Sequence, residues 1–190
     1  MKKLVIVFIS LIVFIFLVIS VAKHFVKREI SQRQELVDNE WKLLRKDVSL
    51  HAELVSKLNK DDKYISNDSL MLILNKQRKT NECTLDFSEN EYYLNKLVLE
   101  VKADTLSNNV DISVLESSHK KLNNLILNYD EAVRNYNDFI RSFPLNLYTF
   151  KRYKTKEFFE LRYGVENENP KTKYDEVPDW MLEIEKSKGL

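Results

Sequence analysis

The stretch LVIVFISLIVFIFLVISVA, from Leu4 to Ala22, decides how the rest of this chain is organised. It contains no charged residue, no glycine and no proline. As an α-helix, this stretch would rise roughly 28 Å, about the thickness of the hydrocarbon core of a bilayer. We therefore expect a transmembrane helix over residues 4–22, preceded by a short tail of residues 1–3.

Two other interpretations compete for this stretch. Lys2 and Lys3 followed by an apolar run, with the small residues Ser20, Val21 and Ala22 at its end, also fit a cleaved signal peptide. The run is longer than the apolar region of a typical signal peptide, which favours a retained span. A buried core helix would need protein on every side, more than the remaining chain can supply. Whether the stretch is ever cleaved stays open.

The bases that flank the stretch indicate an orientation. The flank after it carries Lys23, Lys27, Arg28 and Arg33, and the flank before it carries Lys2 and Lys3. An excess of bases marks the cytoplasmic side of a membrane helix. We therefore expect a single-pass protein of the cell membrane, with its N-terminus outside and the following domain in the cytoplasm.

The composition of the chain indicates long helices and argues against nucleic-acid binding. The 30 bases and 29 acids give a net charge of +1, and only Lys2 and Lys3 precede the apolar stretch, so the part after it carries −1. Such a part lacks the basic excess that binds phosphate backbones. Two glycines and three prolines leave little material for hairpins. The single cysteine, Cys83, cannot form an internal disulfide.

Two segments repeat apolar residues at alternating spacings of three and four, the seam of a helix that packs lengthwise on other helices. The first seam runs through Ile30, Val37, Trp41, Leu44, Val48, His51, Val55 and Leu58, and it has this spacing from Val37 onward. The second runs through Leu115, His119, Leu122, Ile126, Tyr129, Val133, Tyr136 and Ile140. Because no breaker follows Ala22, one rod is expected from the bilayer to about residue 60.

Between the two seams, a second helix is expected over residues 66–79, followed by a loop over 80–87. A third helix is expected to begin at the capping box Ser88–Glu91 and to fade near residue 106. The chain is therefore predicted to be all-α, with an N-terminal transmembrane helix followed by an antiparallel four-helix bundle with long helices over residues 23–161.

The end of the chain is expected to be less regular. Residues 145–161 combine aromatic and basic side chains, and we expect an irregular strap across the end of the bundle, with one helical turn at 156–161. This segment could equally form a membrane-surface or partner patch. Residues 162–190 are expected to be a loose tail with a possible short amphipathic helix near Trp180.

The second seam also carries a family resemblance. The run Tyr129-Asp130-Glu131-Ala132-Val133-Arg134-Asn135-Tyr136-Asn137, followed by Phe143-Pro144-Leu145-Asn146, closely resembles the C-terminal signature of the LemA family, a YNxAVxxYN-type run leading into FPxN. Phe158 and Phe159 fall where that family has an aromatic pair. The resemblance implies a membrane-anchored antiparallel helical bundle without a known catalytic activity. Its motif residues here are Tyr129, Ala132, Val133, Tyr136, Asn137, Phe143, Pro144, Asn146, Phe158 and Phe159.

Several residues have both a structural and a functional interpretation. His51 and His119 lie on the two seams and could face each other as a metal-binding or proton-sensing pair, or simply be partly buried and bonded to backbone or water. Tyr129 and Tyr136 are expected in the core with their hydroxyls reaching a neighbour. Arg134 and Arg141 are expected to be solvated or to compensate a helix dipole, rather than to bind phosphate head groups.

No catalytic pattern is present in the sequence. The P-loop, HExxH and GxSxG patterns are absent, and nothing in the sequence supplies a base for Cys83. We assign no catalytic, cofactor-binding or metal residue. The expected function is a non-catalytic scaffold or accessory interaction protein at the membrane. The alternatives are a self-assembling membrane-surface structural protein, or a pH- or metal-responsive sensor. The expected partners are the bilayer through residues 4–22 and a protein partner or a second copy, without nucleic acid or a small-molecule substrate.

Overall fold

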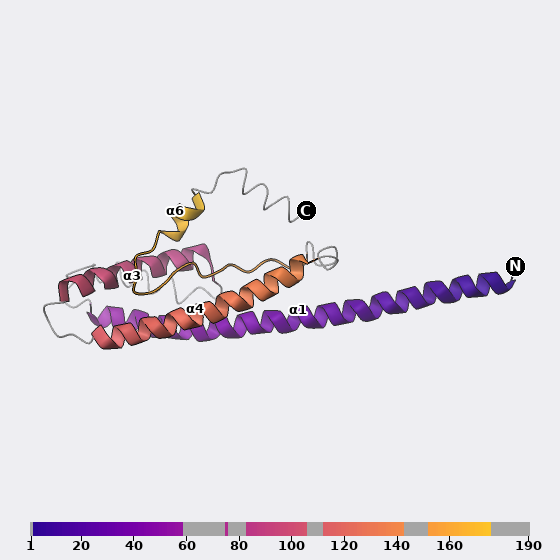
Figure 1. Ribbon diagram of the computed structural model, residues 1–190, viewed down its shortest axis with the longest axis horizontal. Helices are drawn as coiled ribbons and strands as arrows, with labels where there is room; N and C mark the ends of the chain where they lie inside the picture. Colours follow the sequence, from indigo (N-terminus) through magenta and orange to yellow (C-terminus); the bar gives the residue numbers. More distant parts are fainter. Residues whose placement is uncertain (1, 59–74, 76–82, 106–111, 143–151, 176–190) are drawn as a thin grey trace.

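The computed structural model describes residues 2–58, 75, 83–105, 112–142 and 152–175. In these residues the regular secondary structure is helical, with no strand. The helices, drawn in Figure 1, are α1 (Lys2–Leu58), α3 (Leu85–Thr105), α4 (Ile112–Arg141) and α6 (Pro170–Asp175).

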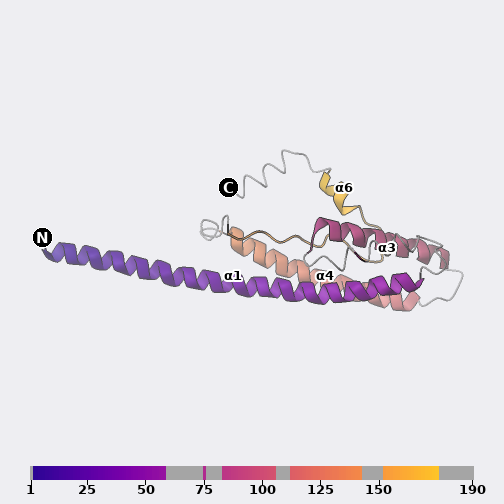
Figure 2. The same cartoon turned by 180° about the vertical axis from the view of Figure 1, so that it is seen from behind.

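Helix α1 is one uninterrupted rod of 57 residues, as the lack of a breaker after Ala22 predicts. The helix already includes Lys2 and Lys3, which precede the apolar stretch. The described side chains from Phe8 to Val21 are exposed, and the N-terminal part of α1 projects beyond the other helices (Figures 1 and 2). By length and composition, α1 is the one described helix that is apolar enough to cross a membrane.

The core lies between α1 and α4, which run antiparallel. Arg33 lies beside Asn135 and Asp47 beside Lys121, so positions that rise along α1 meet positions that fall along α4. The predicted phase of both helices is confirmed, because every seam residue whose side chain is described is buried, His119, Ile126 and Val133 included. Each of the larger apolar side chains contributes about 1.5–3 kcal/mol by leaving water.

Helix α3 begins three residues before the predicted capping box. Thr84 caps it, since its Oγ1 accepts a hydrogen bond from the Phe87 amide (3.2 Å). This earlier start buries Phe87 against Trp41, with their ring centroids 5.0 Å apart. Ser88 and Glu91 are then buried inside the helix, so the prediction that they cap its start is wrong. The burial of Phe87, rather than the capping-box spacing of Ser88 and Glu91, therefore goes with the observed start of the helix.

The second helix, expected over residues 66–79, lies outside the described residues apart from Asn75, which is helical. The short helix expected near Trp180 also lies outside them.

Residues 152–169, which we call the strap, correct two predictions. The strap is extended, without the turn of helix expected at 156–161, and it runs along α4 instead of crossing the end of the bundle (Figures 1 and 2). Phe159, Leu161 and Tyr163 are buried, so the expected loose tail does not begin at residue 162. The reason is the alternation of apolar and charged residues over 159–163, which sends every second side chain of an extended chain inward.

Candidate functional site

The strap is held to α4 by two asparagines that act as a neighbouring strand would. Asn137 donates from Nδ2 to the Lys156 carbonyl and accepts from the Lys156 amide at Oδ1, both at 2.9 Å. Asn123 makes the same pair of bonds with Tyr163, at 3.1 and 2.9 Å. A side-chain amide carries the same donor and acceptor as a peptide group, so each asparagine satisfies both backbone groups of one strap residue.

The clamping residues recur every seven positions on α4. Between the two asparagines, Asp130 Oδ1 accepts the Phe159 amide at 2.9 Å. Seven helical residues rise about 10.5 Å, and about three residues of extended chain cover the same length. The partners Lys156, Phe159 and Tyr163 are three and four residues apart. Helix and strap therefore match in repeat, and the strap runs antiparallel to α4.

The two motif tyrosines join the core to the strap. Tyr129 and Tyr136 bury their rings and donate their hydroxyls to the carbonyls of Glu157 (3.0 Å) and Lys154 (3.3 Å). This confirms that they belong to the core with each hydroxyl reaching a neighbour. The seam and the clamp are thus two neighbouring faces of the same helix.

The remaining motif residues divide into three groups. Ala132 and Val133 are buried in the core, and Phe159 packs with its ring centroid 6.0 Å from that of Phe87. Phe158 is 39% exposed, so the aromatic pair does not act as one unit. The last three motif residues, Phe143, Pro144 and Asn146, lie outside the described residues.

A chain of four buried polar side chains crosses the structure beyond the last clamp. The hydroxyl of Tyr163 shares a hydrogen bond with the carboxyl of Glu91 of α3, and its ring packs on His51 of α1, with centroids 4.8 Å apart. The Nε2 atoms of His51 and His119 are 3.2 Å apart, so the two histidines face each other and hydrogen-bond. Four elements thus each contribute one group to one buried polar chain.

The ionisable groups in this row of polar side chains are uncharged at neutral pH. Burial raises the pKa of Glu91 to about 8, against the lowering effect of the Tyr163 hydrogen bond. Burial, then the charge of His119, lowers the pKa of His51 to about 3. The pKa of His119 is also lowered, by burial and by nearby Lys102. At neutral pH the carboxyl is largely protonated and both imidazoles are neutral.

The hydrogen bond between the two histidines assigns one proton. His51 Nδ1 has no hydrogen-bond partner in the described structure, and neither has Glu91 Oε1. A buried N–H without an acceptor is rarer than a bare lone pair, so we place the proton of His51 on Nε2, which donates to His119 Nε2. One of these unpartnered atoms, Glu91 Oε1, lies at an end of the row of polar side chains, and the other, His51 Nδ1, lies in its middle.

Gly164 lies directly against His119, at one end of this row of polar side chains. Its φ of +79° lies in the left-handed region, and a Cβ atom there would come within 2.8 Å of His119 Nδ1. Asn95 of α3 holds this turn, accepting the Gly164 amide at Oδ1 and donating to the Val165 carbonyl. Within the described residues, no group of three or more His, Cys, Asp or Glu side chains is arranged to hold a metal ion.

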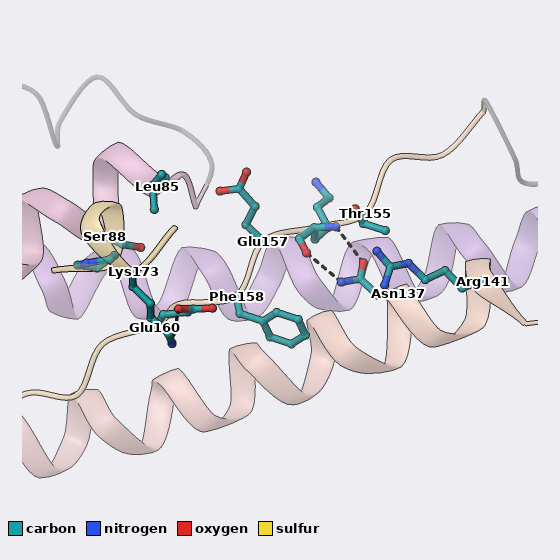
Figure 3. Close-up of a pocket in the computed structure, with 11 residues that line it drawn as sticks. Leu85, Ser88, Asn137, Arg141, Thr155, Glu157, Phe158, Glu160 and Lys173 are labelled. Carbon is teal, nitrogen blue, oxygen red and sulfur yellow. Dashed lines mark hydrogen bonds and ion pairs between the residues drawn. The ribbon is translucent and has the colours of Figure 1, made fainter. Parts of the chain in front are cut away.

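A groove of about 500 Å³ runs beside the other end of the strap (Figure 3). Its walls come from α3, α4, α6 and the strap, and charges of both signs line it, including the ion pair of Lys173 with Glu160 at 2.9 Å. The buried polar chain does not open into it. A smaller groove of about 300 Å³ reaches Cys83, whose thiol donates to the Phe158 carbonyl. Burial raises the pKa of this thiol to about 12, as in an unreactive cysteine.

Sequence reasoning found the histidine pair but missed Glu91, Asn95, Asn123, Asp130 and Tyr163 as site residues. One signal was available, since Asn123, Asp130 and Asn137 repeat every seven positions next to the seam. Such polar repeats usually face solvent, as the exposed Asn124 and Asn128 do here. The role of Asn123, Asp130 and Asn137 becomes clear only from the strap backbone that they bind.

Asn137→Asp should loosen the strap. The carboxylate keeps the bond from the Lys156 amide but replaces the donor to the Lys156 carbonyl by a second acceptor. We expect the free energy of unfolding to fall by about 1–3 kcal/mol and hydrogen exchange of residues 154–158 to accelerate. Asn124→Asp, on the exposed face of α4, is the matched control. Unchanged exchange in Asn137→Asp would show that the clamp does not hold the strap.

Glu91→Gln should change how stability depends on pH. Folded Glu91 keeps its proton up to about pH 8, whereas the unfolded chain releases it near 4.5. The contribution of Glu91 to stability should therefore fall as pH rises from about 4.5 to 8, by about 1.4 kcal/mol per pH unit, and the glutamine variant should lose this contribution. His51, with its lowered pKa, produces a separate loss as pH falls from 6.5 towards 3, which the variant should retain.

The measurement is denaturant unfolding of the full chain in detergent between pH 4 and 9. Glu100→Gln, at an exposed position of α3, should follow the wild type. Parallel curves for Glu91→Gln and wild type would contradict a buried, protonated carboxyl.

Comparison with known proteins adds no relative to this description. No family model, no curated protein and no solved structure matches the chain.

Proposed function

We propose that this chain is a LemA-type, single-pass membrane protein that acts without catalysis, as a scaffold or accessory interaction protein. In this proposal residues 4–22 of α1 cross the cell membrane, the N-terminus lies outside, and the bundle lies in the cytoplasm. The LemA assignment is supported by the motif of residues 129–147, whose described members pack the core and hold the strap.

The observation that carries the proposal is the continuity of α1. Its apolar side chains are exposed up to Val21, and its buried seam begins at Ile30. The residues between them are helical and contain neither glycine nor proline. A helix without a hinge transmits both position and rotation, so a neighbour that holds one face of the membrane-spanning part would always meet the same face of the bundle. A fixed orientation suits a scaffold.

We also propose the antiparallel four-helix arrangement. Phe87 lies beside Trp41, and Glu91 is linked through Tyr163 to His51, so α3 runs parallel to α1. The chain must therefore return roughly 25 Å between the end of α1 and the start of α3. A helix over residues 66–79 would make this return antiparallel to both.

A non-catalytic role is supported by where the buried polar groups lie. Glu91, Tyr163, His51 and His119 contact one another rather than the wall of a described groove. Cys83, the single cysteine of the chain, lines a groove, and its raised pKa keeps the thiol protonated.

The test uses helical phase in native membranes. A photo-crosslinking amino acid in place of Glu157 or Phe158, in the full chain, should form one major adduct, and Lys120, at the far end of α4, is the comparison position. Two alanines inserted after His24 would rotate the bundle by about 200°, and four by about 40°. We expect two alanines to abolish the adduct and four to preserve it. Absence of any adduct, or adducts indifferent to both insertions, would contradict an oriented scaffold.

A second candidate function, self-assembly, is favoured by a stripe of exposed leucines on α1. Leu36, Leu43 and Leu50 are 48%, 52% and 48% exposed and are spaced by seven residues. Two copies anchored in one membrane are already parallel and in register, which raises their effective concentration.

Self-assembly is tested by cysteine crosslinking in a Cys83→Ser background. Leu43→Cys should form disulfide dimers in membranes, and Leu127→Cys, an exposed leucine of α4, should not. Equal crosslinking at both positions would indicate random collision. Failure at Leu43, with the same failure at Leu36 and Leu50, would remove this candidate.

A further inference from the structure

Five bases gather where the bundle meets the apolar part of α1. Three of them, Lys23, Lys27 and Arg28, follow the apolar stretch directly and are exposed. The other two, Arg141 at the end of α4 and Arg152 at the start of the strap, are distant in sequence and also exposed. We call these five residues the collar.

The fold brings two segments towards the first three bases. One is the end of α4, which carries Arg141, and the other is the start of the strap, where Arg152 lies two residues before the Lys154 carbonyl that Tyr136 binds. Arg33 Nη1 donates to the Asn135 carbonyl at 3.2 Å, and the Arg33 guanidinium lies 4.5 Å from the centre of the Phe139 ring. Ile30 and Ile140 belong to the same core cluster. The C-terminus of α4 therefore lies level with the residues just after Arg28, as both views of the ribbon show (Figures 1 and 2).

The collar separates charge along the bundle. Its five bases, with Glu29 as the acid on the same stretch of α1, amount to +4. The chain after Ala22 carries −1 in total, so the rest of it carries −5. Glu29 is itself paired with Arg33, at 2.8 Å. The positive charge thus gathers in the collar, while the rest of the chain after Ala22 is acidic in total.

We propose that the collar binds the anionic phospholipid headgroups of the leaflet from which α1 emerges, so that the base of the folded bundle docks on the membrane. This inference rests on the proposed membrane anchor. The collar reaches from residue 23 to about the level of residue 29, a helical rise of roughly 10 Å, and the headgroup layer is about 5–8 Å deep. Long arginine side chains span the difference.

The position of the collar identifies its partner. Anionic headgroups carry phosphate, which arginine binds through parallel hydrogen bonds. Phe25, 63% exposed between Lys23 and Lys27, and the half-buried Tyr153 beside Arg152 are aromatic residues of the kind that lie at membrane interfaces. An acidic protein or nucleic acid would have to displace the bilayer to reach the same bases.

The experiment measures lipid selectivity around the full chain. The protein is reconstituted in phosphatidylcholine vesicles containing roughly one fifth phosphatidylglycerol, an anionic lipid. Electron spin resonance of spin-labelled phosphatidylglycerol and spin-labelled phosphatidylcholine then gives the fraction of each that the protein immobilises. We expect phosphatidylglycerol to be preferred, and the preference to fall in concentrated salt. Inorganic phosphate should weaken it no more than chloride of equal ionic strength.

The decisive variant is Arg141→Gln with Arg152→Gln, which removes the bases contributed by the fold and keeps those next to the apolar stretch. We expect the preference for phosphatidylglycerol to drop by at least about threefold, since each base near an anionic surface contributes up to about 1 kcal/mol of attraction. Lys96→Gln with Lys120→Gln, exposed bases distant from the collar, is the matched control and should leave the preference unchanged. Thermal unfolding followed by circular dichroism checks that both variants fold.

The outcomes separate the collar from the anchor. If neither spin-labelled lipid is immobilised, α1 does not span the bilayer, and both the proposed anchor and this inference fail. If both are immobilised equally, the anchor stands and the collar does not bind headgroups. An unchanged preference in the double variant, or an equal drop in its control, would likewise overturn docking of the folded bundle on anionic lipid.

Discussion

The structure depends on one constraint, the unbroken helical phase of α1. An α-helix repeats every 3.6 residues, so the rotation of any residue fixes that of all others while hydrogen bonding continues. In this chain the same helix carries an exposed apolar stretch and a buried seam with seven residues between them. The direction in which the seam faces therefore follows from how the apolar stretch is placed, and α4 must pack wherever the seam points.

The strap meets a second constraint, the hydrogen-bonding needs of a buried backbone. An extended chain beside a helix finds no strand to pair with, and unpaired peptide groups are costly to bury. Side chains of α4 replace the missing strand, two of them offering a donor and an acceptor to the same residue. The tyrosines add bonds to two further carbonyls. The YDEAVRNYN segment therefore serves two purposes, packing one face and satisfying the strap with the next.

The helices could be predicted from the sequence because their signal is long. Two seams of alternating threes and fours, one of them ending in Ile140, specify the inward faces of α1 and α4 with little room for another phase. The facing of His51 and His119 followed from those seams, once the two helices were taken as neighbours. A prediction that depended on a short pattern was wrong. A capping-box pattern at Ser88 lost to Thr84, because the fold could bury Phe87 only if the helix began earlier.

The strap shows why the candidate site was harder to predict than the fold. Its alternation spans only Phe159 to Tyr163, too few residues to tell an extended segment from a turn of helix with Phe158 and Phe159 inside. Glu91 is an acid at a helical position, and nothing local indicates that it is buried. Its place is set by Tyr163, a residue far along the chain, so the pattern near Glu91 contains no trace of its partner.

The matching repeats of helix and strap have a mechanical consequence. A slip of the strap by one residue would turn Phe159, Leu161 and Tyr163 outward and leave the amides of Asn123 and Asn137 opposite the wrong peptide groups. A slip of two residues would turn apolar positions inward again, but the clamping side chains would still lie opposite the wrong peptide groups. Only one register therefore pairs all three clamping side chains with the strap and also buries its three apolar side chains.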